Sequence, residues 1–348
     1  MSSNGASNSE KRWEAGMTRR LEAEYVQILR DYLNKQEEDE LYGAQKLGKW
    51  LLLKEISPEE LVDLHGRALE SVREVPEFVR ASFRMLTEVM IEYGNVHRSL
   101  QSVRNKHAQL QAEVEIASAM QQSLLPQTIP SYPGVEIGVV SMAAHGMSGD
   151  YYDFMHFNEH QFSLTIGDIT GKGIPAAMCM SMLKYAVDSL EEIRLGPDQM
   201  LRHLNRVVER NIDPSMFVTM LFGSYDTHNH HFRYAVAGHE PGFLYRAREG
   251  RFYDLEGSGI ALGIAADSSY VEHEFALQSG DVLILLTDGV TESKKGRSYL
   301  VREELVGFLQ NEVDKPAQLM ADEIYRRLMM LAQFEQRDDY TMIVLRRT

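Results

Sequence analysis

Apolar residues recur at spacings of three and four near the start of the chain, which is the pattern of an amphipathic helix. They are Leu21, Tyr25, Ile28, Leu29 and Leu33. A further helix start is indicated by Ser57-Pro58-Glu59-Glu60, which combines an N-cap serine, a proline at the first helical position and acids in the first turn. We therefore expect a helical, partner-binding regulatory domain over residues 17–97, behind a disordered Ser/Asn-rich tail over residues 1–16.

A second apolar stripe alternates spacings of three and four without a break. Its positions are Leu86, Val89, Tyr93, Val96, Leu100, Val103, His107, Leu110, Val114, Ala117, Gln121 and Leu124. This is a heptad pattern, the seam of a coiled coil, and a continuous helix over it would be ~58 Å long at 1.5 Å per residue. We expect residues 98–125 to form a coiled-coil linker helix that makes a homodimer, with polar seam residues that set its register or weaken it. The alternative is one long helix that packs on the C-terminal domain of its own chain.

The pattern changes after Leu125-Pro126 to short apolar runs rich in β-branched residues. Strands are predicted at 135–142, 162–169, 217–225, 232–237, 282–287 and 341–345, and helices at 175–190, 197–211, 302–312 and 316–331. Because the strands come in pairs and the helices in blocks, residues 126–348 are expected to form an α+β sandwich instead of a doubly wound parallel sheet.

The composition narrows the class of protein. The chain has 348 residues, enough for two domains, and its 44% apolar and 25% charged residues are typical of globular proteins. A net charge of −15 argues against nucleic acid or an anionic membrane surface as a partner. With a single cysteine, Cys179, and no apolar secretory signal over residues 1–10, we expect a cytoplasmic protein without disulfides.

Four acidic motifs lie at predicted strand ends or in glycine-containing turns. They are Ser148-Gly149-Asp150, Gly167-Asp168-Ile169-Thr170-Gly171-Lys172-Gly173, Thr287-Asp288-Gly289 and Arg337-Asp338-Asp339-Tyr340-Thr341. Asp168 and Asp288 follow strongly apolar runs, where an unpaired carboxylate would be costly to bury. Because nearby Lys and Arg residues are too few to pair all of these acids, a shared cluster of divalent metal ions is the favoured explanation.

Carboxylate and carbonyl oxygens suit hard ions such as Mg²⁺ or Mn²⁺. A single cysteine leaves no Cys-x-x-Cys pair for zinc. Two hard ions ~3.5–4 Å apart would activate a water and clamp a phosphoryl group for in-line attack. The four motifs together therefore favour metal-dependent chemistry on phosphate.

Other interpretations of the motifs are weaker. Residues Gly167–Gly173 differ from a nucleotide-binding P-loop, because three residues instead of four precede Gly171-Lys172 and a glycine follows in place of Ser or Thr. His239 follows a β-run and is interpreted as a structural hydrogen-bonding residue. Cys179 lies among methionines on a predicted helix and is interpreted as a small core residue.

The motifs SGD, GDITGKGIPAA, AGHEP, TDGVTE and DDYT occur in an order that resembles the PPM-type metal-dependent phosphatases, specifically their bacterial SpoIIE/RsbU branch. The resemblance begins at about Glu113 and extends to the C-terminus. The N-terminal part, with Tyr42–Lys46 and Ser57–Glu60, resembles the same part of RsbU-type members. The resemblance implies a β-sandwich flanked by helices (αββα) and a protein serine/threonine phosphatase.

The resemblance also implies the metal ligands. Asp168 would bridge two Mn²⁺ or Mg²⁺ ions, and the backbone carbonyl of Ile169 would join it on one of them. Asp288 and Asp338 would hold the other ion. Asp339 is the alternative to Asp338, because the two acids are adjacent, and a third ion is left open.

Asp150 and Asp168 are the implied catalytic residues. Asp150 would orient a metal-bound water, either as a direct ligand of the metal ion or through a hydrogen bond to that water. Ahead of Asp150 the sequence shows no arginine of the kind with which the eukaryotic branch binds phosphate. The residues that grip the substrate phosphate are therefore not identified.

The resemblance further implies partners. The substrate would be a phosphorylated anti-anti-sigma-type protein of a stress sigma-factor pathway, and an activating switch-kinase-like protein would bind the N-terminal domain. The competing hypothesis is a pseudophosphatase that keeps the fold and only binds partners. All of the expected acids are present, which disfavours it.

Overall fold

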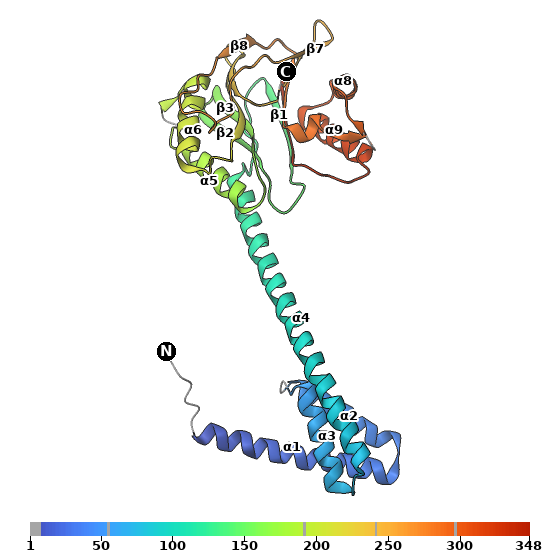
Figure 1. Cartoon of the computed structure of the whole chain (residues 1–348). Coiled ribbons are helices and arrows are strands. Elements are labelled where there is room, and N and C mark those ends of the chain that lie inside the picture. The colour runs from blue at the N-terminus through green and yellow to red at the C-terminus, as the bar shows by residue number, and fades with distance from the viewer. Residues whose placement is uncertain (1–7, 54–55, 191–192, 241, 296–297) are drawn as a thin grey trace. The chain divides into compact units, whose positions relative to one another are not determined.

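The computed structural model describes residues 8–53, 56–190, 193–240, 242–295 and 298–348 (Figure 1). The chain divides into two compact units, Met1–Leu110 and Gln111–Thr348, and the division falls within one long helix, α4 (Glu77–Leu124). No helix in the described part of the chain is both long and apolar enough to cross a membrane.

The N-terminal unit is helical, as predicted. It contains α1 (Asn8–Lys35), α2 (Glu38–Leu53), α3 (Pro58–Val72) and the first part of α4. A small core joins the first three helices through Leu21, Leu47, Leu51 and Leu64. Helix α1 includes residues 8–16, which the sequence assigned to a disordered tail, and residues 1–7 lie outside the described residues. Glu, Lys, Arg and Ala in this stretch favour helix without an apolar stripe.

The start of α3 confirms the helix signal at Ser57. The backbone N–H of Glu60 donates to Ser57 Oγ at 3.3 Å, and the backbone N–H of Ser57 donates to Glu60 Oε2 at 2.9 Å. This reciprocal capping box satisfies two N–H groups that the helix itself leaves unpaired.

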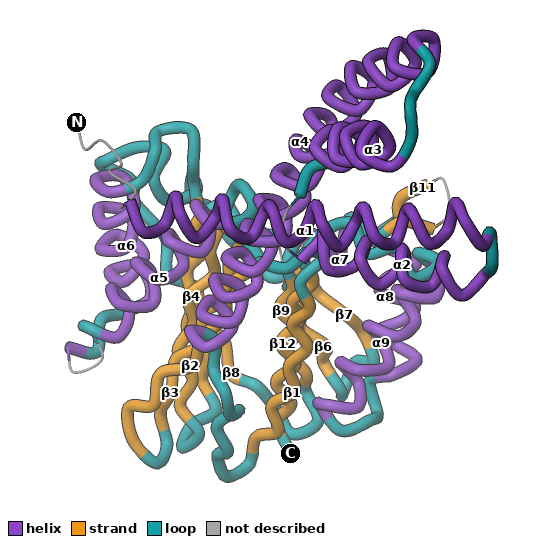
Figure 2. Tube along the Cα trace, turned by 90° about the horizontal axis from the view of Figure 1, so that it is seen from below, coloured by secondary structure: helices purple, strands orange, loops and turns teal. Residues whose placement is uncertain are grey.

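The C-terminal unit is built on two antiparallel five-stranded sheets (Figure 2). The first has the order β1 (Val135–Met142), β12 (Tyr340–Arg347), β9 (Val282–Leu286), β6 (Phe243–Arg246) and β7 (Arg251–Asp254). The second has the order β2 (Asp150–Asn158), β3 (Gln161–Ile169), β4 (Val218–Asp226), β5 (His231–Ala237) and β8 (His273–Ala276). A short hairpin pairs β10 (Lys294–Lys295) with β11 (Ser298–Tyr299).

Helices cover the outer face of each sheet, which confirms the predicted αββα sandwich. Helices α5 (Ile174–Asp188) and α6 (Pro197–Asn211) pack on the second sheet, and α8 (Arg302–Glu312) and α9 (Ala317–Leu331) pack on the first (Figures 1 and 2). Between the sheets lies a third apolar layer that includes Phe162, Leu221 and Ile343. The short helix α7 (Asp288–Thr291) follows β9.

Four strands of the two large sheets, and both strands of the short β10–β11 hairpin, were not predicted. Strand β2 contains Asp150 and Asp153, and acids of this kind are depleted in strands. Asp153 is nevertheless buried, because Lys184 of α5 pairs with it at 2.9 Å and Tyr151 donates a hydrogen bond to it. Strands β6, β7 and β8 have four residues each, too few to show a period of two.

The apolar stripe of α4 is exposed along most of its length and buried near its C-terminal end. Large side chains from Leu86 to Val114 are exposed, with Leu100 exposing 54% of its surface. Near its end the same stripe is covered by the C-terminal unit: Gln121 is 4% exposed, and Leu124 packs on the core beneath α5 and α6. The expectation that Gln121 lies on a coiled-coil seam is therefore wrong, because its carboxamide bonds to the backbone of its own C-terminal unit.

We predict that Ser57→Ala destabilises the N-terminal unit by about 1 kcal/mol, because it leaves an N–H group at the start of α3 without its cap. Both tryptophans, Trp13 and Trp50, belong to this unit, so tryptophan fluorescence during urea unfolding of the full chain reports on it alone. Ser102→Ala, at an exposed position in α4, is the matched control. Equal midpoints for the two variants would contradict the prediction.

Candidate metal centre

The structure brings the four acidic motifs together at one end of the sandwich. Asp150 is the first residue of β2 and lies directly opposite Asp168 of β3 in the strand register. Asp288 begins α7 immediately after β9, and Asp338 precedes β12, the strand that pairs with β9. A hydrogen bond from Thr287 Oγ1 to Asp150 Oδ2, 2.8 Å long, connects the two sheets at this point.

Negative charge is crowded at this end of the sheets. Burial, followed by the charges of Asp288, Asp338 and Asp339, raises the pKa of Asp168 to about 7. Burial and the charge of Asp338 raise the pKa of Asp288 as well. Burial is also the largest reason why the pKa of Asp150 lies well above its usual range, despite the hydroxyl that Thr287 donates. Each of these acids would be stabilised in its charged form by a cation.

Two oxygens of the predicted ligand set face the same small space beside Gly149. A Cβ atom added to Gly149 would lie 2.9 Å from Asp168 Oδ1 and 2.9 Å from the carbonyl oxygen of Ile169. The backbone N–H of Ile169 donates to the carbonyl oxygen of Gly149 at 3.1 Å, which holds the two segments in this position. Only a residue without a side chain fits here.

The adjacent acids Asp338 and Asp339 have different surroundings. Asp339 is 6% exposed, and its two carboxylate oxygens accept the backbone N–H groups of Ala144 at 2.8 Å and Gly149 at 2.5 Å. Asp338 has a side chain that is 53% exposed, and it pairs with Lys172 Nζ at 3.0 Å. Asp339 thus holds the loop that leads to Asp150, whereas Asp338 faces the open side of the cluster.

Lys172 and Thr287 are site residues that the sequence reasoning did not assign. Lys172 lies between Gly171 and Gly173, whose φ angles of 97° and 77° give the backbone the sharp turn that follows Asp168. Its place four residues after Asp168, just before a helix, is the sequence signal that could have identified it. Thr287 lies within the motif Thr287-Asp288-Gly289, but no local signal predicts its hydrogen bond to Asp150, which joins residues that are 137 positions apart.

The donor set fits hard divalent ions. It consists of carboxylates and a backbone carbonyl, the ligands that Mg²⁺ and Mn²⁺ prefer. Within the described ranges, no three His, Cys, Asp or Glu side chains form a ready-made metal cluster. Asp338 instead bonds to Lys172, and Asp150 to Thr287, so a bound ion would have to compete with these contacts.

The two side chains that the sequence assigned to structural roles are buried. His239 lies with its Nδ1 3.1 Å from Thr219 Oγ1, and burial lowers its pKa to about 4. Cys179 lies on the buried face of α5, where burial raises the pKa of its thiol to about 11. A neutral imidazole and a protonated thiol agree with those structural roles.

Two families match the chain. The family described as "Stage II sporulation protein E (SpoIIE)" matches residues 158–348, and the family described as "Phosphoserine phosphatase RsbU, N-terminal domain" matches residues 23–96. Among curated relatives, the phosphoserine phosphatase RsbU of Bacillus subtilis (strain 168) is 42% identical over 328 residues, which cover 94% of this chain and 98% of the relative.

Solved structures of low sequence identity show the same fold. The PP2C domain of SiaA from Pseudomonas aeruginosa superposes with a TM-score of 0.61 at 19% identity, covering 69% of this chain and 98% of that domain. RsbX, solved in complex with magnesium, superposes with a TM-score of 0.50 at 16% identity, covering 64% of this chain and 99% of RsbX. Together with the family matches, they confirm the resemblance found in the motifs: this chain belongs to the SpoIIE/RsbU family of PP2C-type serine phosphatases.

Proposed function

We propose that this phosphatase removes phosphate from phosphoserine or phosphothreonine on a small protein, with two Mn²⁺ or Mg²⁺ ions as cofactors. The observation that carries the proposal is the convergence of Asp150, Asp168, Asp288 and Asp338, with the pKa of Asp168 raised to about 7. Divalent cations relieve this repulsion. The magnesium in RsbX, a protein of the same fold, supports the choice of ion.

The surroundings of each acid support a division of roles. Asp168 and the carbonyl of Ile169 face one space and would hold one ion, and Asp168 would share the other ion with Asp288 and Asp338. Asp339 is engaged by two backbone N–H groups, so we assign it to positioning instead of metal ligation. The bound ions would supply an activated water and neutralise charge on the phosphoryl group.

Asp150 acts on the attacking water, and Lys172 acts on the substrate phosphate. The Asp150 carboxylate is anchored by Thr287 and has a raised pKa, so it is suited to orient the attacking water and to hold its proton. Lys172 carries its ammonium group at the open side of the cluster, just before the N-terminus of α5. Both the ammonium and the helix N-terminus favour a substrate phosphate, for which the sequence offered no arginine.

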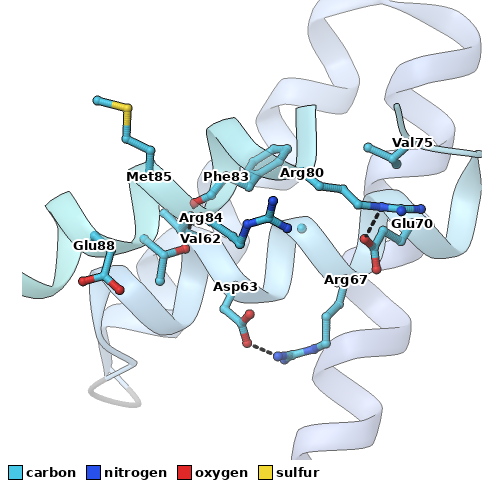
Figure 3. A pocket seen from close by; sticks show the side chains of 12 residues that line it. Val62, Asp63, Arg67, Glu70, Val75, Arg80, Phe83, Arg84, Met85 and Glu88 are labelled. Atoms are coloured by element: carbon cyan, nitrogen blue, oxygen red, sulfur yellow. Dashed lines mark hydrogen bonds and ion pairs between the residues drawn. The ribbon is translucent and has the colours of Figure 1, made fainter. Parts of the chain in front are cut away.

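We place this reaction in a stress sigma-factor pathway, as the 42% identity to RsbU supports. The substrate is a phosphorylated anti-anti-sigma-type protein, and an activating switch-kinase-like protein binds the N-terminal unit. A pocket of about 480 Å³ between α3 and α4 offers a surface for that partner (Figure 3). It combines the charged side chains of Asp63, Arg67, Glu70, Arg80 and Arg84 with the apolar Phe83 and Met85, a mixture found at protein interfaces.

The exposed part of the α4 stripe supports a homodimer. From Leu86 to Val114 it presents apolar residues at heptad spacing to solvent, and single chains rarely leave such a stripe uncovered. A second copy of the same helix covers it with matching spacing.

We predict that Asp168→Asn and Asp288→Asn each reduce turnover by about 100-fold or more, because each removes a charge that holds the ions. The measurement is Mn²⁺-dependent release of phosphate from a phosphoserine protein, with chelator as the blank. Asp267→Asn, an exposed acid, is the control and keeps full activity. Near-normal rates in either site variant would refute the assignment. A wild-type protein that binds its partners but releases no phosphate, even with the activating partner present, would favour the pseudophosphatase hypothesis.

Gly149→Ala is expected to reduce turnover by about 100-fold while leaving the fold intact. Its methyl group would lie 2.9 Å from both Asp168 Oδ1 and the Ile169 carbonyl oxygen, which is too close, so these oxygens would have to shift. A misplacement of about 1 Å in an active site can lower the rate by about 100-fold. Gly146→Ala, in the same loop but with no atom within 4 Å of the added methyl group, should retain activity. Circular dichroism checks the fold, and equal activity of the two variants would contradict the prediction.

Leu100→Asp is expected to convert the dimer into a monomer, because it places a charge on the apolar stripe of both helices. Asn105→Asp adds the same charge to the same helix away from the stripe and should leave the dimer intact. Light scattering coupled to size-exclusion chromatography measures the mass. A wild-type chain that is monomeric at micromolar concentration would refute the dimer.

A further inference from the structure

The last turns of α4 bind the backbone of the loop that precedes Asp150. Gln121 Nε2 donates to the carbonyl oxygen of Ser148 at 2.6 Å, and the backbone N–H of Ser148 donates to Gln121 Oε1 at 2.9 Å. One side chain thus satisfies both backbone groups of a single residue. One turn earlier on α4, Ser118 Oγ donates to the carbonyl oxygen of Gly146.

The opposite side of the same loop is held by Asp339. Its carboxylate accepts the backbone N–H groups of Ala144 and Gly149, at the two ends of the loop. Within the loop, Ser148 Oγ accepts the backbone N–H of Asp150 at 3.0 Å. Residues 144–149 are therefore held between α4 on one side and Asp339 on the other.

The position of Ser148 determines where its two neighbours lie. Gly149 lies directly beside Asp168 Oδ1 and the Ile169 carbonyl oxygen. Asp150 carries the buried carboxylate that accepts the hydrogen bond from Thr287 Oγ1. Ser148 is 8% exposed, so without Gln121 its N–H and C=O groups would have little water to replace the lost bonds. The loop would have to move to satisfy them, and Gly149 and Asp150 would move with it.

We infer that Gln121 is a positioning residue for the metal centre: its carboxamide holds Ser148 so that Gly149 and Asp150 take the geometry in which the acidic cluster binds its ions. This inference rests on the proposed metal-dependent function. It makes the C-terminal end of α4 a support for the metal centre, although α4 contributes none of the proposed metal ligands.

The test uses Gln121→Leu, which removes both hydrogen bonds at similar volume, and Gln121→Glu, which keeps an acceptor for the Ser148 N–H but sets a carboxylate against the Ser148 carbonyl. Gln122→Leu, at the next and exposed position, is the matched control. Mn²⁺ binding to the full-length chain is measured by calorimetry and by electron paramagnetic resonance without substrate. The KM for a phosphoserine protein and the melting temperature are measured alongside.

We expect both Gln121 variants to bind Mn²⁺ about 10- to 100-fold more weakly. A loss of this size is usual when a residue that orients the metal ligands, without touching the metal itself, is replaced. Excess Mn²⁺ should restore much of the turnover, KM should change little, and Gln122→Leu should match the wild type. Mn²⁺ affinity at the wild-type level in a folded Gln121 variant, with or without a lower melting temperature, would overturn the inference. If Gln121→Leu does not fold, the Mn²⁺ affinity of Gln121→Glu decides. A wild-type chain that binds no Mn²⁺ would instead refute the proposed function before any variant is compared.

Discussion

A cluster of carboxylates that repel one another is the constraint on which this structure depends. Asp150, Asp168 and Asp288 are partly or fully withdrawn from water, and neighbouring acids add to the rise in the pKa of each. Such a cluster persists only where a rigid scaffold holds the acids and protons or cations neutralise them. The sandwich supplies the scaffold, because antiparallel pairing sets Asp150 opposite Asp168 and its three apolar layers fix the sheets. The same repulsion explains why divalent ions, and through them a phosphate, are suitable ligands.

Neutral donors, more than basic side chains, hold this cluster in place. Thr287 donates its hydroxyl to Asp150, and backbone N–H groups of the loop over residues 144–149 donate to Asp339. Lys172 lies at the exposed edge, where it pairs with Asp338. Because the neutral donors orient the acids without cancelling their charge, the centre keeps its affinity for cations. The lysine lies at the open side of the cluster, where both its side chain and that of Asp338 are more than half exposed.

One stripe of side chains on helix α4 runs from exposed positions to the loop that precedes Asp150. The stripe is apolar and exposed around Leu100 and Val103, where a second copy can cover it. At Gln121 the stripe becomes polar and buried, and its carboxamide bonds to Ser148, two residues before Asp150. In the proposed dimer, a change in the pairing of α4 reaches the acids through this short series of hydrogen bonds. A switch of this kind would also need two stable arrangements of the loop.

By itself, the sequence determined the features that depend on local patterns. The capping box at Ser57, the strand at Val135–Met142 and the helix at Pro197–Asn211 follow from spacing, end signals and runs of apolar residues. The motifs also identified the acids and the family. Only the tertiary structure decided that Asp339 binds the loop while Asp338 faces outward, that Asp153 is buried in β2, and that Gln121 binds the backbone of Ser148. These outcomes depend on contacts between distant residues, 190 positions apart for Asp339 and Gly149 and 27 for Gln121 and Ser148, and no local pattern of side chains encodes such a contact.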